Sequence, residues 1–257
     1  MAKSPNLQKW ELTQNSIPDD IAFNIVSFLS ASDVCSLGCC SRFWRDLCAS
    51  DFIWISLSKQ RWPSFDLYKM AQDSNDQDII TQPTKEWRIF YIKWHKVMAC
   101  KAKILSKFVK QCSHQESLEV GDYLRAIGHL CKMELGFEDI QLFLFTKKQN
   151  VLLNLIGLHY SLFCLGTSAE VVMNALSSCQ ISERQVCVRW WKLGRWFHGF
   201  RLRDESRSRR VSLGALAMAK ENEVMGVLHR GAIHEVLRVQ ISAEPAITAW
   251  TCWHSEG

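Results

Sequence analysis

The sequence predicts a mainly α-helical protein that carries a small antiparallel β region toward its C-terminus. Three patterns favour this fold class. Residues 17–63 divide into short amphipathic segments, each introduced by a residue that favours a helix start. Residues 86–112 keep apolar side chains at the 3.6-residue spacing of a helix over about seven turns. After residue 182 the apolar spacing falls in places to two residues, which is typical of strands.

The bulk composition is that of an ordinary folded protein. The 257 residues are 47% hydrophobic and 22% charged, and this length accommodates one or two domains. Residues 1–15 are polar and carry no secretion signal. The most apolar window, Val151–Leu165, is shorter than the roughly 20 residues of a membrane span and contains Asn154 and His159. We therefore expect a buried helix there and no membrane segment.

The cysteines point to reduced thiols rather than to a disulfide framework. There are 11 of them, an odd number, and no two stand in a Cys-x-x-Cys pair that would suggest zinc. Such scattered cysteines behave as small hydrophobic residues in a reducing compartment. The expected location is therefore the cytoplasm, the nucleus or both.

Motifs of catalysis are missing from the sequence. Neither the glycine-rich phosphate-binding patterns nor Gly-x-Ser-x-Gly occurs. His234 and Glu235 begin a pair like that of zinc proteases, but Arg238 stands where the second histidine is required. We expect no catalytic residue, no metal site and no cofactor.

The first predicted helix starts at Pro18, because the missing N–H of proline suits a first helical position. Asp19 and Asp20 follow in the first turn, where acids interact favourably with the positive end of the helix dipole. The apolar positions of this helix form one stripe at i, i+4, i+7 and i+8, namely Ile21, Ile25, Phe28 and Leu29.

Serines introduce the short helices that follow. Ser30 or Ser32 is the expected cap of a helix over residues 33–39, and Ser41 is the expected cap of the next. The apolar residues of the third and fourth predicted helices are Phe43, Trp44, Leu47, Phe52, Trp54, Ile55 and Leu57. Because these apolar faces are too many for so small a core, we expect a partner or the flanking chain to cover some of them.

Residues 17–63 resemble the F-box family. The family pattern is Leu-Pro with an acid, Ile-x-x-x-Leu, Asp-Leu with a later Leu, Val-Ser-Arg-x-Trp-Arg-x-Leu, and Leu-Trp-x-x-Leu. The matching segments, in that order, are Ile17-Pro18-Asp19-Asp20-Ile21, Ile25 with Leu29, Asp33-Val34 with Leu37, Cys40-Ser41-Arg42-Phe43-Trp44-Arg45-Asp46-Leu47, and Ile53-Trp54-Ile55-Ser56-Leu57. The departures from the pattern, at Ile17, Val34, Cys40 and Ile53, all keep an apolar side chain.

The resemblance implies a non-catalytic subunit of a Skp–cullin–F-box ubiquitin ligase. In that family the F-box binds a Skp-type adaptor, the adaptor binds a cullin, and the rest of the chain recognises a substrate protein. The residues that the resemblance assigns to the adaptor interface are Ile17, Pro18, Ile21, Ile25, Leu29, Leu37 and Trp44. Two alternatives remain open: an F-box protein with a cullin-independent scaffold role, and a nucleic-acid-binding regulator.

The predicted domain order is a tail over residues 1–16, the F-box over 17–63, a linker over 64–85 and a recognition region over 86–257. Residues 72–84 are polar and include Pro83, which favours a connecting loop. Many F-box proteins carry a helix with Trp and Tyr directly after the box. By that resemblance, we expect the helix over 86–112 to couple the F-box rigidly to the recognition region.

Further helices are predicted in the first part of the recognition region. Apolar stripes predict helices over residues 120–131 and 171–179, the latter behind a Ser168 cap. Residues 137–145 and 151–165 are apolar on nearly all sides, so we expect them at the centre of the domain.

The C-terminal third is predicted to combine short strands and helices. Ser182 with Gln185 resembles a capping box, which predicts a short helix ending at Gly194. The later expected elements are a strand over 196–202, a turn over 204–208, a return strand over 209–213, a helix over 213–228 that stops at Gly231, and a strand over 237–241.

The positive charge is concentrated in one segment. Residues 184–210 hold nine Lys or Arg and two acids, a net charge of +7, although the whole chain is only +5. Three interpretations are open: a solvated basic face with inward tryptophans, a site for a phosphorylated or acidic substrate, and a nucleic-acid site. The candidate substrate-binding residues are Arg189, Arg195, Arg201, Arg203, Arg207, Arg209 and Arg210.

Overall fold

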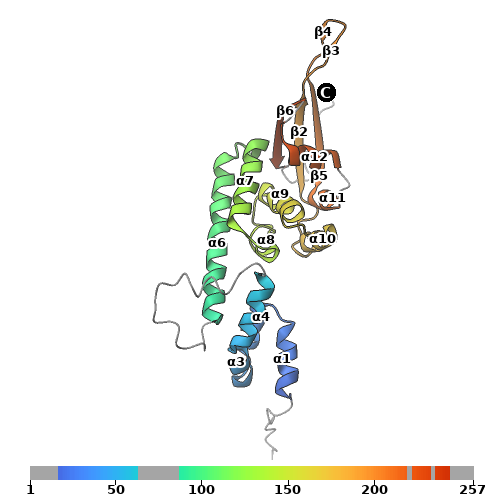
Figure 1. Cartoon of the computed structure of the whole chain (residues 1–257). Coiled ribbons are helices and arrows are strands. Elements are labelled where there is room, and N and C mark those ends of the chain that lie inside the picture. The colour runs from blue at the N-terminus through green and yellow to red at the C-terminus, as the bar shows by residue number, and fades with distance from the viewer. Residues whose placement is uncertain (1–16, 63–86, 219–221, 233–234, 244–257) are drawn as a thin grey trace, which may run out of the picture. The chain divides into compact units, whose positions relative to one another are not determined.

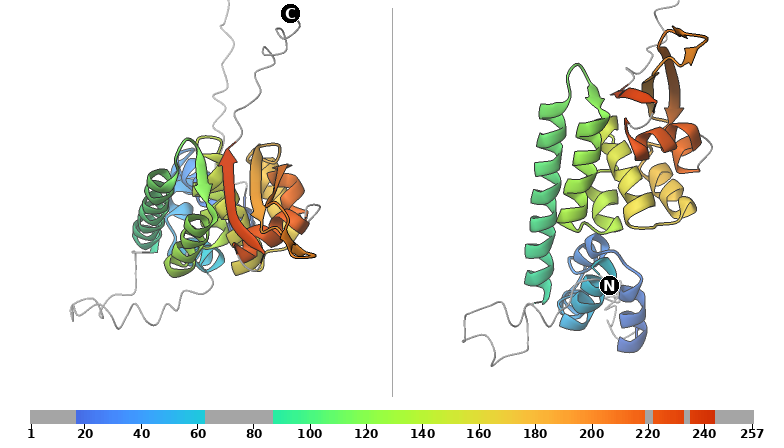
Figure 2. Two further views of the ribbon diagram at one scale, coloured as in Figure 1. Left: turned by 90° about the horizontal axis from the view of Figure 1, so that it is seen from above. Right: turned by 45° about the horizontal axis from the view of Figure 1, so that its top comes forward.

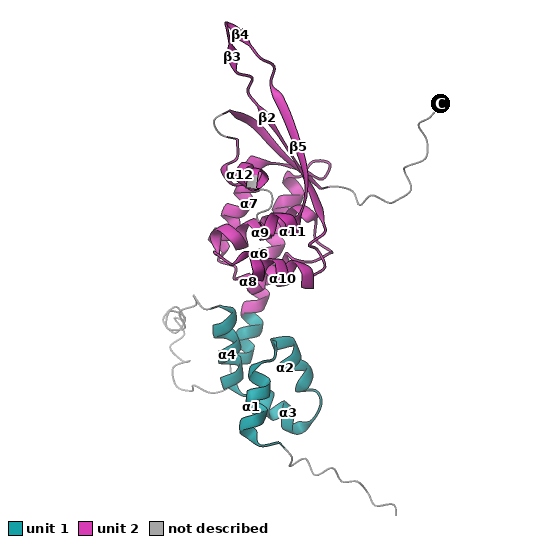
Figure 3. Ribbon diagram, turned by 90° about the vertical axis from the view of Figure 1, so that its right-hand side faces the viewer, with its two compact units in different colours: residues 1–93 teal, residues 94–257 magenta. Residues whose placement is uncertain are grey.

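The computed structural model describes residues 17–62, 87–218, 222–232 and 235–243. The chain divides into two compact units, residues 1–93 and 94–257 (Figure 3). The predicted tail over residues 1–16 and the predicted linker over 64–85 lie outside the described residues. The predicted fold class is confirmed, because the described chain is mainly helical with a small antiparallel sheet toward the C-terminus.

Four short helices open unit 1 (Figure 1). Two of them begin at serines that the sequence marks as caps, because the side-chain oxygens of Ser30 and Ser41 accept hydrogen bonds from the N–H groups of Asp33 and Trp44. The helices are α1 (Asp19–Ser27), α2 (Ala31–Leu37), α3 (Arg42–Cys48) and α4 (Asp51–Arg61).

Helix α6 (Trp87–Cys112) confirms the long helix predicted over residues 86–112. Its residues up to Lys93 belong to unit 1 and the later ones to unit 2. The buried side chains follow the helical repeat along one face, at Tyr91, Met98, Ala102, Leu105 and Val109. Rigid coupling of the two units by this helix stays a prediction.

Aromatic packing around Tyr91 forms the core of unit 1. The ring of Tyr91 lies 5.3 Å from that of buried Trp54 and 5.2 Å from that of Trp62. Trp54 Nε1 donates to the carbonyl of Cys48 over 2.8 Å, and Arg61 donates to the Tyr91 hydroxyl over 2.8 Å. The first turns of α6 therefore complete the small core that the preceding helices leave unfinished.

Helix α9 is the centre of unit 2, as the sequence predicts, because each of its nine residues is buried. A π-helical segment, η1, continues it directly. Apart from α6, the helices of unit 2 are α7 (Val120–Met133), α8 (Phe137–Phe143), α9 (Val151–His159), η1 (Tyr160–Cys164), α10 (Ala169–Ser178), α11 (Leu213–Ala217) and α12 (Asn222–Arg230). None of the helices in the described part of the chain has the length and apolar character needed to cross a membrane.

A four-stranded antiparallel sheet lies on the helices of unit 2 (Figures 1 and 2). Helices α7, α9 and α11 pack against one face of the sheet, and none of the described helices covers the opposite face, called the open face below. The side chains that meet those helices include Val186, Val188, Trp190, Val239 and Ile241, all buried. In the order β1-β6-β2-β5, the strands are β1 (Ser117–Glu119), β6 (Val236–Ala243), β2 (Gln185–Lys192) and β5 (Glu205–Ser212).

The short helix predicted from Ser182 to Gly194 is wrong, because this segment forms strand β2. Its side chains alternate between buried positions, such as Val186 and Val188, and positions on the open face, such as Arg189. Two long neighbours pair with it, β5 along its whole length and β6 from Val186 to Lys192. This pairing and the burial of alternate side chains outweigh the local preference of a capping box for a helix.

The continuous strand predicted over 196–202 is also wrong. The chain reverses at His198 and Gly199, whose φ angles of 47° and 82° are those of a tight two-residue hairpin turn. The reversal leaves two short paired strands, β3 (Trp196–Phe197) and β4 (Phe200–Arg201).

The turn predicted over 204–208 is wrong as well, whereas the strand predicted over 209–213 is confirmed over residues 209–212, which lie in β5. Strand β5 already begins at Glu205, and its partner is β2 rather than the segment 196–202. The helical prediction for 213–228 is confirmed, although the structure has two helices there, α11 and α12. The strand predicted over 237–241 lies within β6 and is confirmed.

Three polar side chains in mutual contact extend from the core of unit 2 to its surface. The hydroxyl of buried Tyr123 lies 2.9 Å from Nδ1 of buried His159, and His159 Nε2 lies 3.3 Å from Nδ1 of exposed His229. Burial, and next the proximity of His229, lower the pKa of His159 to about 4. Burial likewise raises the pKa of Tyr123 well above its ordinary value, so both groups are neutral at physiological pH.

We expect Trp190→Ala to lower the free energy of unfolding by about 3–5 kcal/mol, because it removes a fully buried side chain between the sheet and the helices. Trp196→Ala, at a side chain that is 74% exposed, is the matched control and is expected to change it by less than about 1 kcal/mol. Urea denaturation followed by circular dichroism measures both. Equal losses would contradict the inward orientation of Trp190.

We expect acid to destabilise unit 2 partly through His159. Its folded-state pKa of about 4 lies below that of a free histidine, about 6.5. Between these values the unfolded chain binds a proton that the folded chain does not, so stability is full above pH 6.5 and falls as the pH drops toward 4.

The expected loss from this one group is roughly 2–3 kcal/mol by pH 4. In the variant His159→Gln the pH dependence over this window is expected to be shallower than in the native chain, because no proton is taken up on unfolding. Unfolding midpoints in urea at pH 4, 5, 6 and 7 compare the two chains. If the unfolding midpoints of both chains fall equally as the pH drops, His159 does not cause this loss of stability.

Candidate functional site

One face of helix α1 exposes large apolar side chains. Ala22 and Val26 are fully buried in unit 1, whereas Ile21 and Ile25 are 52% and 42% exposed and Phe28 is 89% exposed. The stripe that the sequence marks as apolar therefore points away from the unit's own core. Folded proteins seldom leave such a row uncovered unless another molecule binds it.

The other predicted adaptor-binding residues lie around this helix. Pro18 is the N-cap of α1, one position before the predicted one, and its carbonyl accepts hydrogen bonds from the N–H groups of Ile21 and Ala22. Ile17 is exposed beside it. The remaining three, half-buried at the ends of α1 and α2 and within α3, are Leu29, Leu37 and Trp44.

Two exposed phenylalanines extend the apolar character of unit 1 beyond the predicted set. Phe28 closes the α1 row, and Phe52 at the start of α4 is 69% exposed, with its ring 6.4 Å from that of Phe23. Phe28 belongs to the predicted stripe and was identifiable from spacing. Phe52 was not, because nothing in the spacing distinguishes it from the buried residues of α4.

The sheet divides the predicted basic cluster between its two faces. Arg207 and Arg209 of β5 lie opposite Trp190 and Val188 of β2, so they project toward the face that carries the helices. Arg189 and Arg210 project from the open face. A single continuous Arg surface is therefore not formed, although the seven residues lie within one segment of the sequence.

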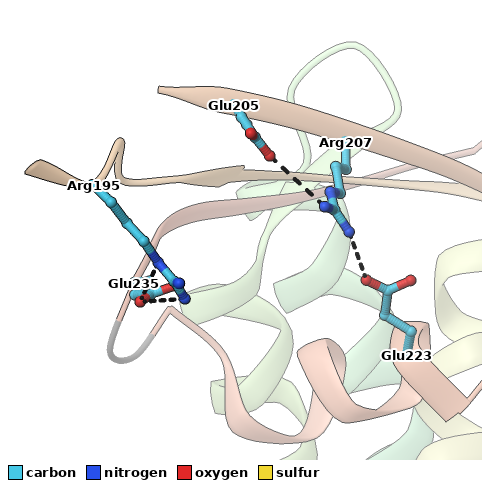
Figure 4. Close-up of polar contacts among 5 residues, drawn as sticks. All are labelled: Arg195, Glu205, Arg207, Glu223 and Glu235. Carbon is cyan, nitrogen blue, oxygen red and sulfur yellow. Dashed lines mark hydrogen bonds and ion pairs between the residues drawn. The ribbon is translucent and has the colours of Figure 1, made fainter. Parts of the chain in front are cut away.

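Acidic partners neutralise three of these arginines, of which Arg195 and Arg207 are drawn in Figure 4. Arg195 binds Glu235 through two hydrogen bonds of 3.1 Å, and Arg207 lies 3.4 Å from Glu223 and 3.7 Å from Glu205. Hydrogen bonding to Glu235 raises the pKa of Arg195 above its ordinary value. These exposed pairs order the side chains but contribute little to stability individually.

The third pair, Arg201 with Asp204 at 2.9 Å, belongs to the base of the β3–β4 hairpin. The backbone N–H of Gly194 also donates to Asp204 over 2.9 Å, and this bond and Arg201 lower the pKa of the Asp204 carboxyl. A Cβ atom on Gly194 would stand 1.9 Å from the carbonyl oxygen of Leu202, so only glycine fits there. The base of the hairpin is therefore held together by the bond between Gly194, which precedes β3, and Asp204, which follows β4.

The tip of this hairpin is strongly apolar and exposed. It lies at the far end of strands β2 and β5 from the helices of unit 2 (Figures 1 and 3). The exposed fractions are 74% for Trp196, 64% for Phe197, 78% for Phe200 and 56% for Leu202. Large aromatic side chains on a well-defined backbone are the type of residue that dominates binding energy in protein interfaces.

The open face of the sheet carries a second aromatic and cationic group. The guanidinium groups of Arg238 and Arg189 lie 5.1 and 6.0 Å from the ring of Trp191, and Arg238 also binds Glu119 through hydrogen bonds of 3.1 and 3.2 Å. Sequence reasoning named Arg189 but missed Arg238 and Glu119. These two come from β6 and β1, so only the strand order brings them together.

The two remaining candidates, Arg203 and Arg209, have no ion-pair partner among the residues that the structure describes. Over the same residues, no group of three or more His, Cys, Asp or Glu side chains is arranged to hold a metal ion. What the described surfaces offer is therefore apolar and cationic contact area, on α1, on the hairpin and on the open face of the sheet.

Comparison with known protein families gives one match, and it falls on unit 1. Residues 14–60 match the family model described as F-box-like. Neither the curated proteins nor the solved structures yielded a match to the chain. The match covers α1 to α4, the same helices whose exposed apolar row is described above. The chain therefore carries an F-box-like domain at residues 14–60.

Proposed function

We propose that this chain is a non-catalytic substrate-recognition subunit of a Skp–cullin–F-box ubiquitin ligase, acting in ubiquitin-dependent protein degradation. Its F-box-like domain would bind a Skp-type adaptor and, through it, a cullin, while unit 2 binds the substrate. The observation that supports this most is the exposed apolar row of α1, Ile21, Ile25 and Phe28, within a domain of that family. We expect such a subunit in the cytoplasm, the nucleus or both.

Burial of this row provides a physical basis for adaptor binding. Complete burial of an Ile or Phe side chain stabilises by roughly 1.5–3 kcal/mol, and these side chains are already partly buried in the free domain. Together with Ile17, Pro18, Leu29, Leu37 and Trp44 around them, they form the adaptor interface in this proposal.

The role of a ligase subunit in this proposal is positioning rather than chemistry. Holding a substrate near a charged conjugating enzyme raises the effective concentration of its lysines. The substrate contacts we propose are the hairpin tip and the candidate arginines Arg189, Arg195, Arg201, Arg203, Arg207, Arg209 and Arg210. A cullin-independent scaffold role is the alternative for the same adaptor-binding surface, and the presence of cullin in the purified complex distinguishes the two.

We expect the double variant Ile21→Asp, Ile25→Asp to weaken binding of a purified Skp-type adaptor at least about 100-fold, because two charges would be buried in an apolar interface. Ile104→Asp in α6, at a side chain that is 54% exposed, is the matched control and should bind as the native chain does. Isothermal titration calorimetry measures the affinities, and circular dichroism verifies that each variant is folded.

Co-purification from cells then separates the ligase from the scaffold role. We expect the native chain to co-purify with both adaptor and cullin. The double variant is expected to co-purify with neither. Recovery of adaptor without cullin would favour the scaffold role. A folded native chain that binds no Skp-type adaptor would overturn the proposal.

For unit 2 we expect the hairpin variant Trp196→Ser, Phe200→Ser to keep adaptor binding but to lose ubiquitination of its substrates, because its exposed apolar tip is removed. Quantitative ubiquitin-remnant proteomics in cells that express native or variant chain measures this loss. Ile104→Asp serves again as the control, and an unchanged set of ubiquitinated proteins in the hairpin variant would exclude the tip as a substrate contact.

The nucleic-acid alternative makes a different prediction. It requires binding of single-stranded RNA or DNA that weakens steeply with salt and is lost when Arg201, Arg203 and Arg209 are changed to Glu. We expect no such salt-dependent binding, since acidic side chains already neutralise several of the arginines. Fluorescence anisotropy with labelled oligonucleotides at 50 to 200 mM salt decides this.

A further inference from the structure

Two cysteines of unit 2 lie in direct contact. The Sγ atoms of Cys131, in the last turn of α7, and Cys164, the last residue of η1, are 3.5 Å apart. Both residues are exposed and neither is in a disulfide. A modest side-chain movement would bring the two sulfur atoms to the bonding distance of about 2.05 Å.

The π-helical segment η1 provides a second observation at the same place. Its wider turn is marked by the bond from the N–H of Leu165 to the carbonyl of Tyr160, five residues earlier, over 3.0 Å. Such segments are rare and are frequently found at functional sites. The wider turn changes the direction in which Cys164 projects, compared with a continued α-helix.

A buried hydrogen bond fixes η1 to the chain that follows α7. The hydroxyl of Tyr160 donates to the carbonyl of Leu135 over 3.1 Å, and both residues are buried. This contact lies four residues from Cys131 and from Cys164 in the sequence. The backbone near each of the two cysteines is therefore held in place. The contact between the two thiols thus does not require large movements of the backbone.

We propose that Cys131 and Cys164 are a redox modification site, at which hydrogen peroxide converts the two thiols to a reversible intramolecular disulfide. Intracellular disulfides in most organisms are transient and often redox-sensing, which fits an exposed pair of reduced thiols. This inference is independent of the proposed ligase function, because it concerns unit 2 alone.

The reaction has two balanced steps. The thiolate of Cys131 attacks the O–O bond of the peroxide, forms the S–O bond of a sulfenic acid and releases hydroxide, which takes up a proton to become water. The sulfur of Cys164 then attacks the Cys131 sulfur, forms the S–S bond and expels the sulfenic oxygen as a second water, which carries away the thiol proton of Cys164. The two thiols lose two electrons and two protons, the peroxide is reduced, and a dithiol reductant reverses the change.

The desolvation of Cys164 suggests an order for the two residues. Burial, and next its hydrogen bond with Cys131, raise the pKa of Cys164 to about 11, so Cys164 stays protonated at neutral pH. Only the thiolate reacts with peroxide at a useful rate. The proposal accordingly assigns the first oxidation to Cys131 and the resolving step to Cys164.

The experiment uses the full-length chain, treated with hydrogen peroxide, alkylated with N-ethylmaleimide and digested for mass spectrometry. We expect a cross-linked peptide pair that contains Cys131 and Cys164, lacks two hydrogen atoms, and disappears after treatment with dithiothreitol. The oxidised chain is expected to melt roughly 5–10 °C higher, because the new bond closes a loop between two helices. Cys100→Ser, at an exposed cysteine of α6, is the control and should form the same cross-link.

Single substitutions test the order of the steps. With the sulfenic-acid reagent dimedone present, Cys164→Ser should accumulate an adduct on Cys131, and Cys131→Ser should label Cys164 at least about 10-fold more slowly. Both substitutions are at exposed positions, and the melting temperature of each reduced variant verifies that it folds.

Three results would overturn the proposal. One is oxidation of the native chain without the Cys131–Cys164 cross-link, and another is cross-links distributed at random among the cysteines. The third is equal dimedone labelling of Cys164 in Cys131→Ser and of Cys131 in Cys164→Ser, which would contradict the assigned roles.

Discussion

Helix α9 has no solvent-exposed residue, and the arrangement of unit 2 follows from the need to cover it on every side. Helix α8 approaches so closely that a Cβ atom on Gly157 would stand 3.1 Å from side-chain atoms of Ile140 and Phe145. Strands β2 and β6 and helices α7 and α11 also pack against it. Its one amide, on Asn154, is satisfied by the carbonyl of Leu144 and by Arg184, both 2.5 Å away. A residue at the start of the basic segment thus serves the core rather than a ligand.

The helices were predictable because each has a signal of its own. Apolar spacing identified α6 and α7, and serine caps marked the starts of α2, α3 and α10. The sheet was not predictable to the same extent, because its stability comes from pairing between segments distant in sequence. In β2 the local capping-box signal favours a helix, and only hydrogen bonds to β5 and β6 decide the outcome. The His198-Gly199 turn was missed because alternating aromatic residues on both sides of it resemble one strand.

The candidate sites, too, were only partly predictable from the sequence. The apolar row of α1 was visible in the sequence, but its orientation was not, since spacing alone cannot tell a core face from a binding face. That Ala22 and Val26 rather than the larger residues face the core depends on how closely the helices of unit 1 pack. For the basic segment, alternation along β2 and β5 sends neighbouring arginines to opposite faces, and acids from α12 and the loop before β6 approach two of them. Charge density along a sequence is therefore a poor guide to charge density on a surface.

Two exposed apolar groups on one chain impose a physical cost that argues for binding partners. Phe28 and its neighbours on α1, and Trp196 with Phe200 on the hairpin, would favour aggregation if they stayed uncovered. Each group stands on a backbone that its own unit holds in place, α1 by the burial of Ala22 and Val26 and the hairpin by Asp204. Binding to a pre-organised surface costs little conformational entropy, so most of the apolar area buried there contributes to affinity. One such surface in each unit fits the proposed role of a subunit that links two other proteins.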